Sequence, residues 1–137
     1  MYGRSMISFS SINIIAVFVA SFVCMAIGFI WYSPKVFGLQ WMRLVEKSKD
    51  MKKAFGIGFT ATFINMFFIA MLLQIVGTTH VGEAFTVAVV LWCATAFAGE
   101  LHAVAWQKHP KELFFINIGV SFLTFTIGAS IIQWWPA

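Results

Sequence analysis

The sequence predicts an all-α fold, an integral membrane bundle of four transmembrane helices with a short amphipathic segment at the membrane surface between the first and the second. Hydrophobic residues make up 61% of the 137 residues and charged residues only 10%, whereas soluble domains carry about 45–50% apolar and about 25% charged residues. The chain also holds four long apolar stretches, each near the roughly 20 residues that a helix needs to cross a bilayer. A chain of this length has room for a single domain, residues 1–137.

The four predicted spans cover residues 12–32, 54–76, 84–106 and 113–135. The first span follows Arg4, as the apolar region of a signal peptide would, but it is too long and no small-residue cleavage site follows it. None of the four stretches shows the strict alternation of a transmembrane β-strand. We therefore expect four retained helices.

The basic residues indicate how these helices are oriented, because cytoplasmic loops retain Lys and Arg. Eight of the nine basic residues lie in the segments 33–53 and 107–112, and the ninth is Arg4. The two basic segments join the first span to the second and the third to the fourth, so they lie on one side of the membrane. We expect a multi-pass protein of the cell membrane with both termini outside the cytoplasm.

The basic segment 33–53 also has an apolar side. Trp41 and Leu44 fall toward one side of a predicted helix that runs from Phe37 to Lys53, with Arg43 toward the other, which is typical of a helix on the membrane surface. Basic residues near the surface attract anionic lipid by about 1 kcal/mol each. The residues expected to do so are Arg43, Lys47, Lys49, Lys52 and Lys53. The net charge of +4 is attributed to topology, and no nucleic-acid partner is expected.

Small and polar residues recur along one face of several spans. The first span carries Ala16, Ala20, Cys24, Gly28 and Tyr32, the second Gly58, Thr62 and Asn65, and the fourth Asn117, Ser121, Thr124 and Gly128. In each set the spacing keeps the residues on one helix face, and helices in lipid associate through such residues. Two interpretations remain open, a packing seam and a polar path through the bundle.

Glu100 is the only charged residue inside a predicted span. It lies six residues from Trp106 at the end of the third span, or about 9 Å deep. An acid at that depth is costly and marks a functional site by default. His102 projects to the opposite side of an ideal helix, beside small residues that suit contact with a second subunit. We therefore expect a homo-oligomer, most simply a dimer.

Other polar groups lie at a similar depth to Glu100. Asn117 lies about 7 Å into the fourth span, and Trp31 and Tyr32 end the first span on the same side of the membrane. We expect Glu100, Asn117 and Tyr32 to form a polar cluster beside Trp31, with His102 as an outer member. Two roles remain open for Glu100, proton exchange that serves binding or release, and a permanently neutral acid that makes structural hydrogen bonds.

Two motifs resemble a known family. The run GFIWYSP at 28–34, followed by Phe37, Gly38, Trp41 and Met42, resembles the opening of the membrane family known as domain of unknown function 1761, and FFINIG at 114–119 resembles its fourth-helix motif. The resemblance covers nearly the whole chain. It implies a small four-helix membrane protein with no activity to carry over.

The first of these motifs also has a mechanical interpretation. Pro34 disfavours helical geometry at Ser33, so the first helix should end there. Gly38 permits a tight turn back toward the membrane. We expect a capping turn beneath the bundle, which explains the motif without a ligand.

Two functions of different classes suit this sequence. The first is an oligomeric transporter or channel for a small solute or protons, with Glu100 as the titrating group. The alternative is a non-catalytic scaffold or accessory subunit that binds a partner protein and anionic lipid. Co-purification with a stoichiometric partner would favour the second.

An enzyme is not expected, because the sequence holds no HExxH motif, no Gly-rich phosphate loop and no nucleophile beside a base. The three histidines are scattered over both sides of the membrane, so no metal or cofactor is expected. Cys24 and Cys93 lie at different depths, and both are expected to be small buried residues.

Overall fold

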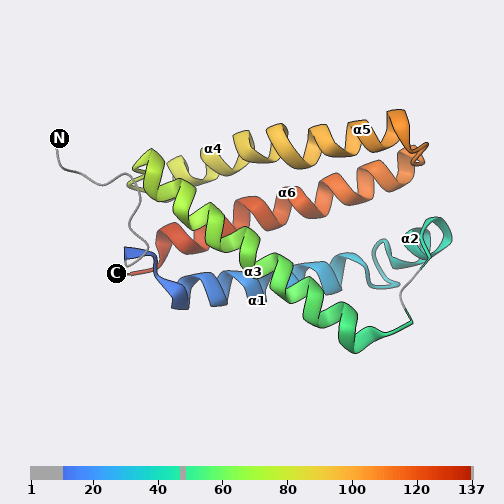
Figure 1. The fold of residues 1–137 in the computed structure, drawn as a ribbon, viewed down its shortest axis with the longest axis horizontal. Helices are drawn as coiled ribbons and strands as arrows, with labels where there is room; N and C mark the ends of the chain where they lie inside the picture. Colours follow the sequence, from blue (N-terminus) through green and yellow to red (C-terminus); the bar gives the residue numbers. More distant parts are fainter. Residues whose placement is uncertain (1–10, 47–48, 137) are drawn as a thin grey trace.

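A computed structural model describes residues 11–46 and 49–136 and shows a bundle of helices, without a strand in these two ranges (Figure 1). The elements are α1 (Ile14–Trp31), α2 (Gly38–Leu44), α3 (Met51–Val76), α4 (Val81–Trp92), a π-helical turn (Cys93–Phe97), α5 (Ala98–Trp106) and α6 (Lys111–Trp134). The stretches 14–31, 51–76, 81–106 and 111–134 are long and apolar enough to cross a membrane. The predicted all-α fold class with four such helices is confirmed. Arg4 and Lys47, which belong to the predicted charge pattern, lie outside the described residues.

Polar caps set the beginnings of three helices. The side chain of Asn13 accepts a hydrogen bond from the N–H of Ala16 at 3.1 Å, and that of Asp50 accepts one from Lys53 at 3.1 Å. His80 caps α4 in the same way. Because such caps satisfy N–H groups that a helix end leaves unpaired, α3 and α4 begin at Met51 and Val81, before the spans predicted from apolar content alone.

Helix α6 is the centre of the bundle and packs against α1, α2, α3, α4 and α5. In Figure 1, α6 lies between α1 and the α4–α5 stretch, and α3 runs obliquely across α1. Helix α1 begins and α6 ends at the end of the bundle that carries the α3–α4 turn, which we call the termini end. Helix α2 and the α5–α6 turn lie at the opposite end, which we call the α2 end.

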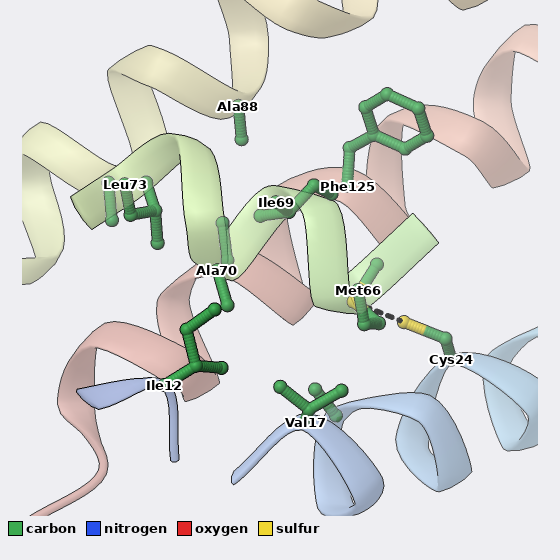
Figure 2. Packing of buried hydrophobic residues seen from close by; sticks show 12 residues of the cluster. Ile12, Val17, Cys24, Met66, Ile69, Ala70, Leu73, Ala88 and Phe125 are labelled. Atoms are coloured by element: carbon green, nitrogen blue, oxygen red, sulfur yellow. Dashed lines mark hydrogen bonds between the residues drawn. The ribbon is translucent and has the colours of Figure 1, made fainter. Parts of the chain in front are cut away.

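The main apolar core lies toward the termini end and is drawn in Figure 2. Its buried members are Ile12, Val17, Ala20, Cys24, Met66, Ile69, Ala70, Leu73, Ala84, Ala88, Phe125 and Ala129. Met66 of α3 faces Cys24 of α1, whose thiol donates to the Met66 sulfur at 3.8 Å. The α2 end holds far fewer buried apolar side chains, mainly from the start of α6.

The small residues of α1 form a packing seam only along part of their length. Ala16, Ala20 and Cys24 are buried, as the seam interpretation requires. Gly28 does not continue this seam, since a Cβ built there would meet nothing within 4 Å. On α6, by contrast, a Cβ at Gly128 would lie 3.3 Å from the sulfur of Cys24. The close contact of helices therefore belongs to the termini end.

Two further expectations are corrected. The π turn (Cys93–Phe97) adds a residue to the helix and so shifts the faces that precede it by one position. Cys93 is exposed, and the prediction that it is buried is wrong. The helix expected from Phe37 to Lys53 is also too long, because Val45 is extended (φ −132°, ψ 137°) and ends α2 after 7 residues.

Candidate functional site

Glu100, Asn117 and Tyr32 meet at the α2 end of the bundle. The amide nitrogen Nδ2 of Asn117 donates to Glu100 Oε1 at 3.3 Å, and the Tyr32 hydroxyl donates to Asn117 Oδ1 at 3.2 Å. Asn117 thus uses both its donor and its acceptor, and the two hydrogen bonds join α5, α6 and the end of α1. We call these three residues the carboxyl network.

The second carboxyl oxygen of Glu100, Oε2, is buried and has no hydrogen-bond partner within the described ranges. The ion pair found within those ranges joins His80 and Glu83 at the termini end. No basic side chain of the described ranges therefore forms an ion pair with Glu100. An unpaired buried charge is costly. Either a proton or a bound group on Oε2 would remove that cost.

Trp31 fixes α1 against α6 next to the carboxyl network. Its indole N–H donates to the carbonyl oxygen of Ile116 at 2.9 Å. Its ring covers Gly119, where an added Cβ would lie 2.8 Å from ring carbon Cη2. The two motifs noticed in the sequence therefore contact each other, because Trp31 and Tyr32 of the first bind the segment 116–119 of the second.

The sequence reasoning missed the roles of Gly119 and of the Ile116 carbonyl. The signal was the motif itself, which places a glycine two residues after Asn117. A backbone carbonyl carries no sequence signal, so this acceptor could be found only from the structure.

The chain turns sharply between α1 and α2, as predicted from Pro34 and Gly38. Helix α1 ends at Trp31, and the carbonyl oxygen of Ser33 accepts from the N–H of Val36 at 3.0 Å and of Gly38 at 2.8 Å. A Cβ at Gly38 would lie 2.7 Å from backbone atoms of Ser33. This close approach, rather than an unusual φ, requires glycine at that position.

Helix α2 supports the aromatic side chains at the end of α1. The ring centroids of Trp31 and Phe37 lie 4.7 Å apart, and those of Tyr32 and Trp41 lie 5.2 Å apart. Trp31 and Tyr32 thus contact α6 with one side and pack against Phe37 and Trp41 with the other. Ser33, Pro34, Gly38 and Trp41 accordingly position Trp31 and Tyr32 for their contacts with α6.

A groove with a volume of about 520 Å³ opens beside Tyr32, between α1, α3 and α6. Its lining is mainly apolar, with polar side chains from Tyr32, Thr62, Asn65, Ser121 and Thr124. Tyr32 lines the groove and also belongs to the carboxyl network, so it links the two.

The predicted site residues His102 and Ser121 do not join the carboxyl network. His102 is exposed, and no hydrogen bond or ion pair joins it to the described part of the chain. The expectation of an outer histidine is wrong, because residues two apart point to opposite sides of a helix. Ser121 accepts a hydrogen bond from the Trp92 indole at 2.9 Å and donates to the Ile118 carbonyl at 3.1 Å, so it secures α4 against α6. Sequence reasoning did not single out Trp92.

The family described as "Protein of unknown function (DUF1761)" matches residues 15–133. The matched region contains both motifs and all members of the carboxyl network. No curated protein and no solved structure matches the chain.

Proposed function

The chain belongs to the DUF1761 family of proteins of unknown function, and we propose that it is a transporter or channel of the cell membrane for a small solute or protons. Glu100 is the group that takes up and releases the proton. The observation that supports this role is the state of its carboxyl, with Oε1 held by Asn117 and Oε2 buried without a partner among the described residues.

The carboxyl network joins Glu100 to the groove through hydrogen bonds that orient its carboxyl. Asn117 holds Oε1 in place whether or not Oε2 carries a proton. Tyr32, the next member, has its hydroxyl on Asn117 and its ring on the groove wall. A proton or a small solute in the groove is therefore two hydrogen bonds from Glu100, which suits coupling between the two.

The burial of the third long helix supports a homo-oligomer, most simply a symmetric dimer. The stretch 81–106 is the least buried of the four. In its most apolar part 11% of the residues are buried, against 22–28% in the other three. A second copy of the chain packed there would cover polar His102 and Thr95. A protein that is monomeric in lipid by native mass spectrometry would contradict this part of the proposal.

The exposed basic residues support an orientation with the α2 end in the cytoplasm. Those described at this end are Lys35, Arg43, Lys49, Lys52, Lys53, Lys108 and Lys111. They also suit binding to anionic lipid, and both termini would then lie outside the cytoplasm. In a variant without Cys24 and Cys93, a cysteine at position 49 that reacts with an impermeant maleimide from outside intact cells would contradict the orientation.

Proton flux through Glu100→Gln tests the central part of the proposal. The purified protein is reconstituted into liposomes that contain a pH-sensitive dye, and a potassium diffusion potential drives proton entry. Wild type should acidify the lumen faster than protein-free liposomes. Glu100→Gln should lower this rate by about tenfold or more, because the amide keeps the shape of the acid and cannot carry the proton.

Glu112→Gln is the matched control. Glu112 is an exposed acid in the first turn of α6, so its loss removes a carboxyl without touching the network and should leave the flux unchanged. Equal flux in wild type and Glu100→Gln would remove Glu100 from the mechanism. A wild type no faster than empty liposomes, together with a stoichiometric partner in the preparation, would favour a scaffold that uses the basic α2 end.

A further inference from the structure

We propose that the groove between α1, α3 and α6 binds an uncharged, mainly apolar organic molecule whose single hydrogen-bonding group is recognised by Asn65. The ligand of this groove would be the small solute of the proposed function. The inference rests on the proposed function only where it couples the ligand to Glu100.

The size and lining of the groove suit an organic molecule. Its volume of about 520 Å³ falls within the range of about 300–1,000 Å³ typical of such sites. Aromatic side chains of Phe29, Tyr32, Trp41 and Phe55 line it. The rings of Phe29 and Phe55 pack with centroids 5.0 Å apart and are 53% and 41% exposed, so they form the boundary between the groove and the surroundings of the bundle.

Asn65 is the polar side chain of the groove wall whose donors and acceptor are all unused within the described ranges. Thr62 donates to the Gly58 carbonyl at 2.9 Å, and Thr124 donates to the Ser121 carbonyl at 3.1 Å. These hydroxyl hydrogens are therefore used within their own helices. The half-buried amide of Asn65 makes no hydrogen bond with any residue of the ranges 11–46 and 49–136.

A free amide in the middle of a spanning helix excludes a plain acyl chain as the preferred occupant. In hydrocarbon there is no water to satisfy the amide, and leaving it against a lipid tail is costly. An occupant with one carbonyl, hydroxyl or N–H group removes that cost while its apolar body fills the rest of the groove. Asn65 is thus the element of the groove that selects its ligand.

The described part of the groove wall carries no charged side chain, and this favours an uncharged ligand. No Asp, Glu, Lys or Arg of the ranges 11–46 and 49–136 lines the groove. Glu100 is separated from it by Asn117 and Tyr32, so an ionised ligand would have no counter-ion in contact. Gly28 adds to the available space, since a Cβ there would meet nothing within 4 Å.

Binding of 2-naphthol and naphthalene tests the proposal, because the two differ by one hydroxyl group. The protein is held in lipid nanodiscs, and retention by empty nanodiscs is subtracted to remove partition into lipid. Wild type should bind 2-naphthol with an affinity at least about tenfold above naphthalene, as expected of a site built to pair with a polar group.

Three variants locate the binding. Asn65→Leu should lower the affinity for 2-naphthol to that for naphthalene, and Gly28→Leu should abolish the binding of both by filling the groove. Gly56→Leu is the control, because Gly56 is also a helical glycine with nothing within 4 Å of an added Cβ, and it does not line the groove. It should bind as wild type does. Gel filtration confirms that each variant is folded.

Several results would overturn the proposal. Equal binding of the two probes that Asn65→Leu leaves unchanged would show a groove for lipid tails. Binding that survives Gly28→Leu would place the site elsewhere, and no retention above empty nanodiscs would exclude this ligand class. Glu100→Gln should still bind 2-naphthol. In wild type, normal proton flux without binding of 2-naphthol would refute the groove proposal alone. Normal binding without proton flux would refute the proposed function alone.

Discussion

The two ends of this bundle are built from the same helices in different ways. At the termini end, Val17, Met66 and Ala129 are almost completely buried, and small residues bring α1, α3 and α6 into contact. At the α2 end a groove lies between the same three helices, and the contacts to α6 are hydrogen bonds from Trp31 and Tyr32. The difference shows that the close packing of α1, α3 and α6 at the termini end opens into a groove toward the α2 end.

The change occurs within α1 and can be read in its sequence. From Ala16 to Cys24 its inner face carries small residues, which allow close approach of backbones. After Gly28 the face carries Trp31 and Tyr32, whose large side chains need room and a polar partner. The same helix therefore closes the core at one end and supports the site at the other.

Leucine substitution of matched glycines should break this comparison most clearly. Gly128→Leu places a side chain against Met66 and Cys24 in the packed end and should lower stability by about 3 kcal/mol. Gly28→Leu enters open space and should cost little. The fraction of protein that stays monodisperse after heating in detergent measures both, and equal losses would show that the two ends do not differ in packing.

A smaller effect is expected where Trp31 meets α6. Gly119→Ala forces the indole ring away from α6 and weakens its bond to Ile116, which should cost about 1–2 kcal/mol. In a Trp31→Leu background the same change should cost little, because the ring is gone. Additive losses in this double-mutant cycle would show that the two residues act independently.

Depth arithmetic from the sequence was sufficient to bring Glu100, Asn117 and Tyr32 together, because rise per residue is constant along a helix. Rotation about the helix axis was harder to predict. The π turn places Trp92 against α6 and leaves Cys93 exposed, and ideal periodicity does not reveal such a turn. The groove at Asn65 depends on how far α3 lies from α1 and α6, and helix spacing is set by the sum of many side chains.

Whether the carboxyl of Glu100 exchanges its proton decides between the two roles that the sequence left open for this residue. A permanently neutral acid is structural, whereas an acid that exchanges its proton is functional. The contacts of Oε1 suit both, since Asn117 can donate to either form of the carboxyl. Only a change of protonation distinguishes them.

Infrared spectroscopy of the protein in lipid, recorded as a function of pH, tests this claim most directly. Subtracting the spectrum of Glu100→Gln from that of wild type isolates the carboxylic acid C=O band of Glu100. The control variant Glu112→Gln should keep this Glu100 band. Our account predicts a band that is present at low pH and is lost as the pH rises, because the acid releases its proton. A Glu100 signal that stays constant at every pH at which the protein is folded would contradict it.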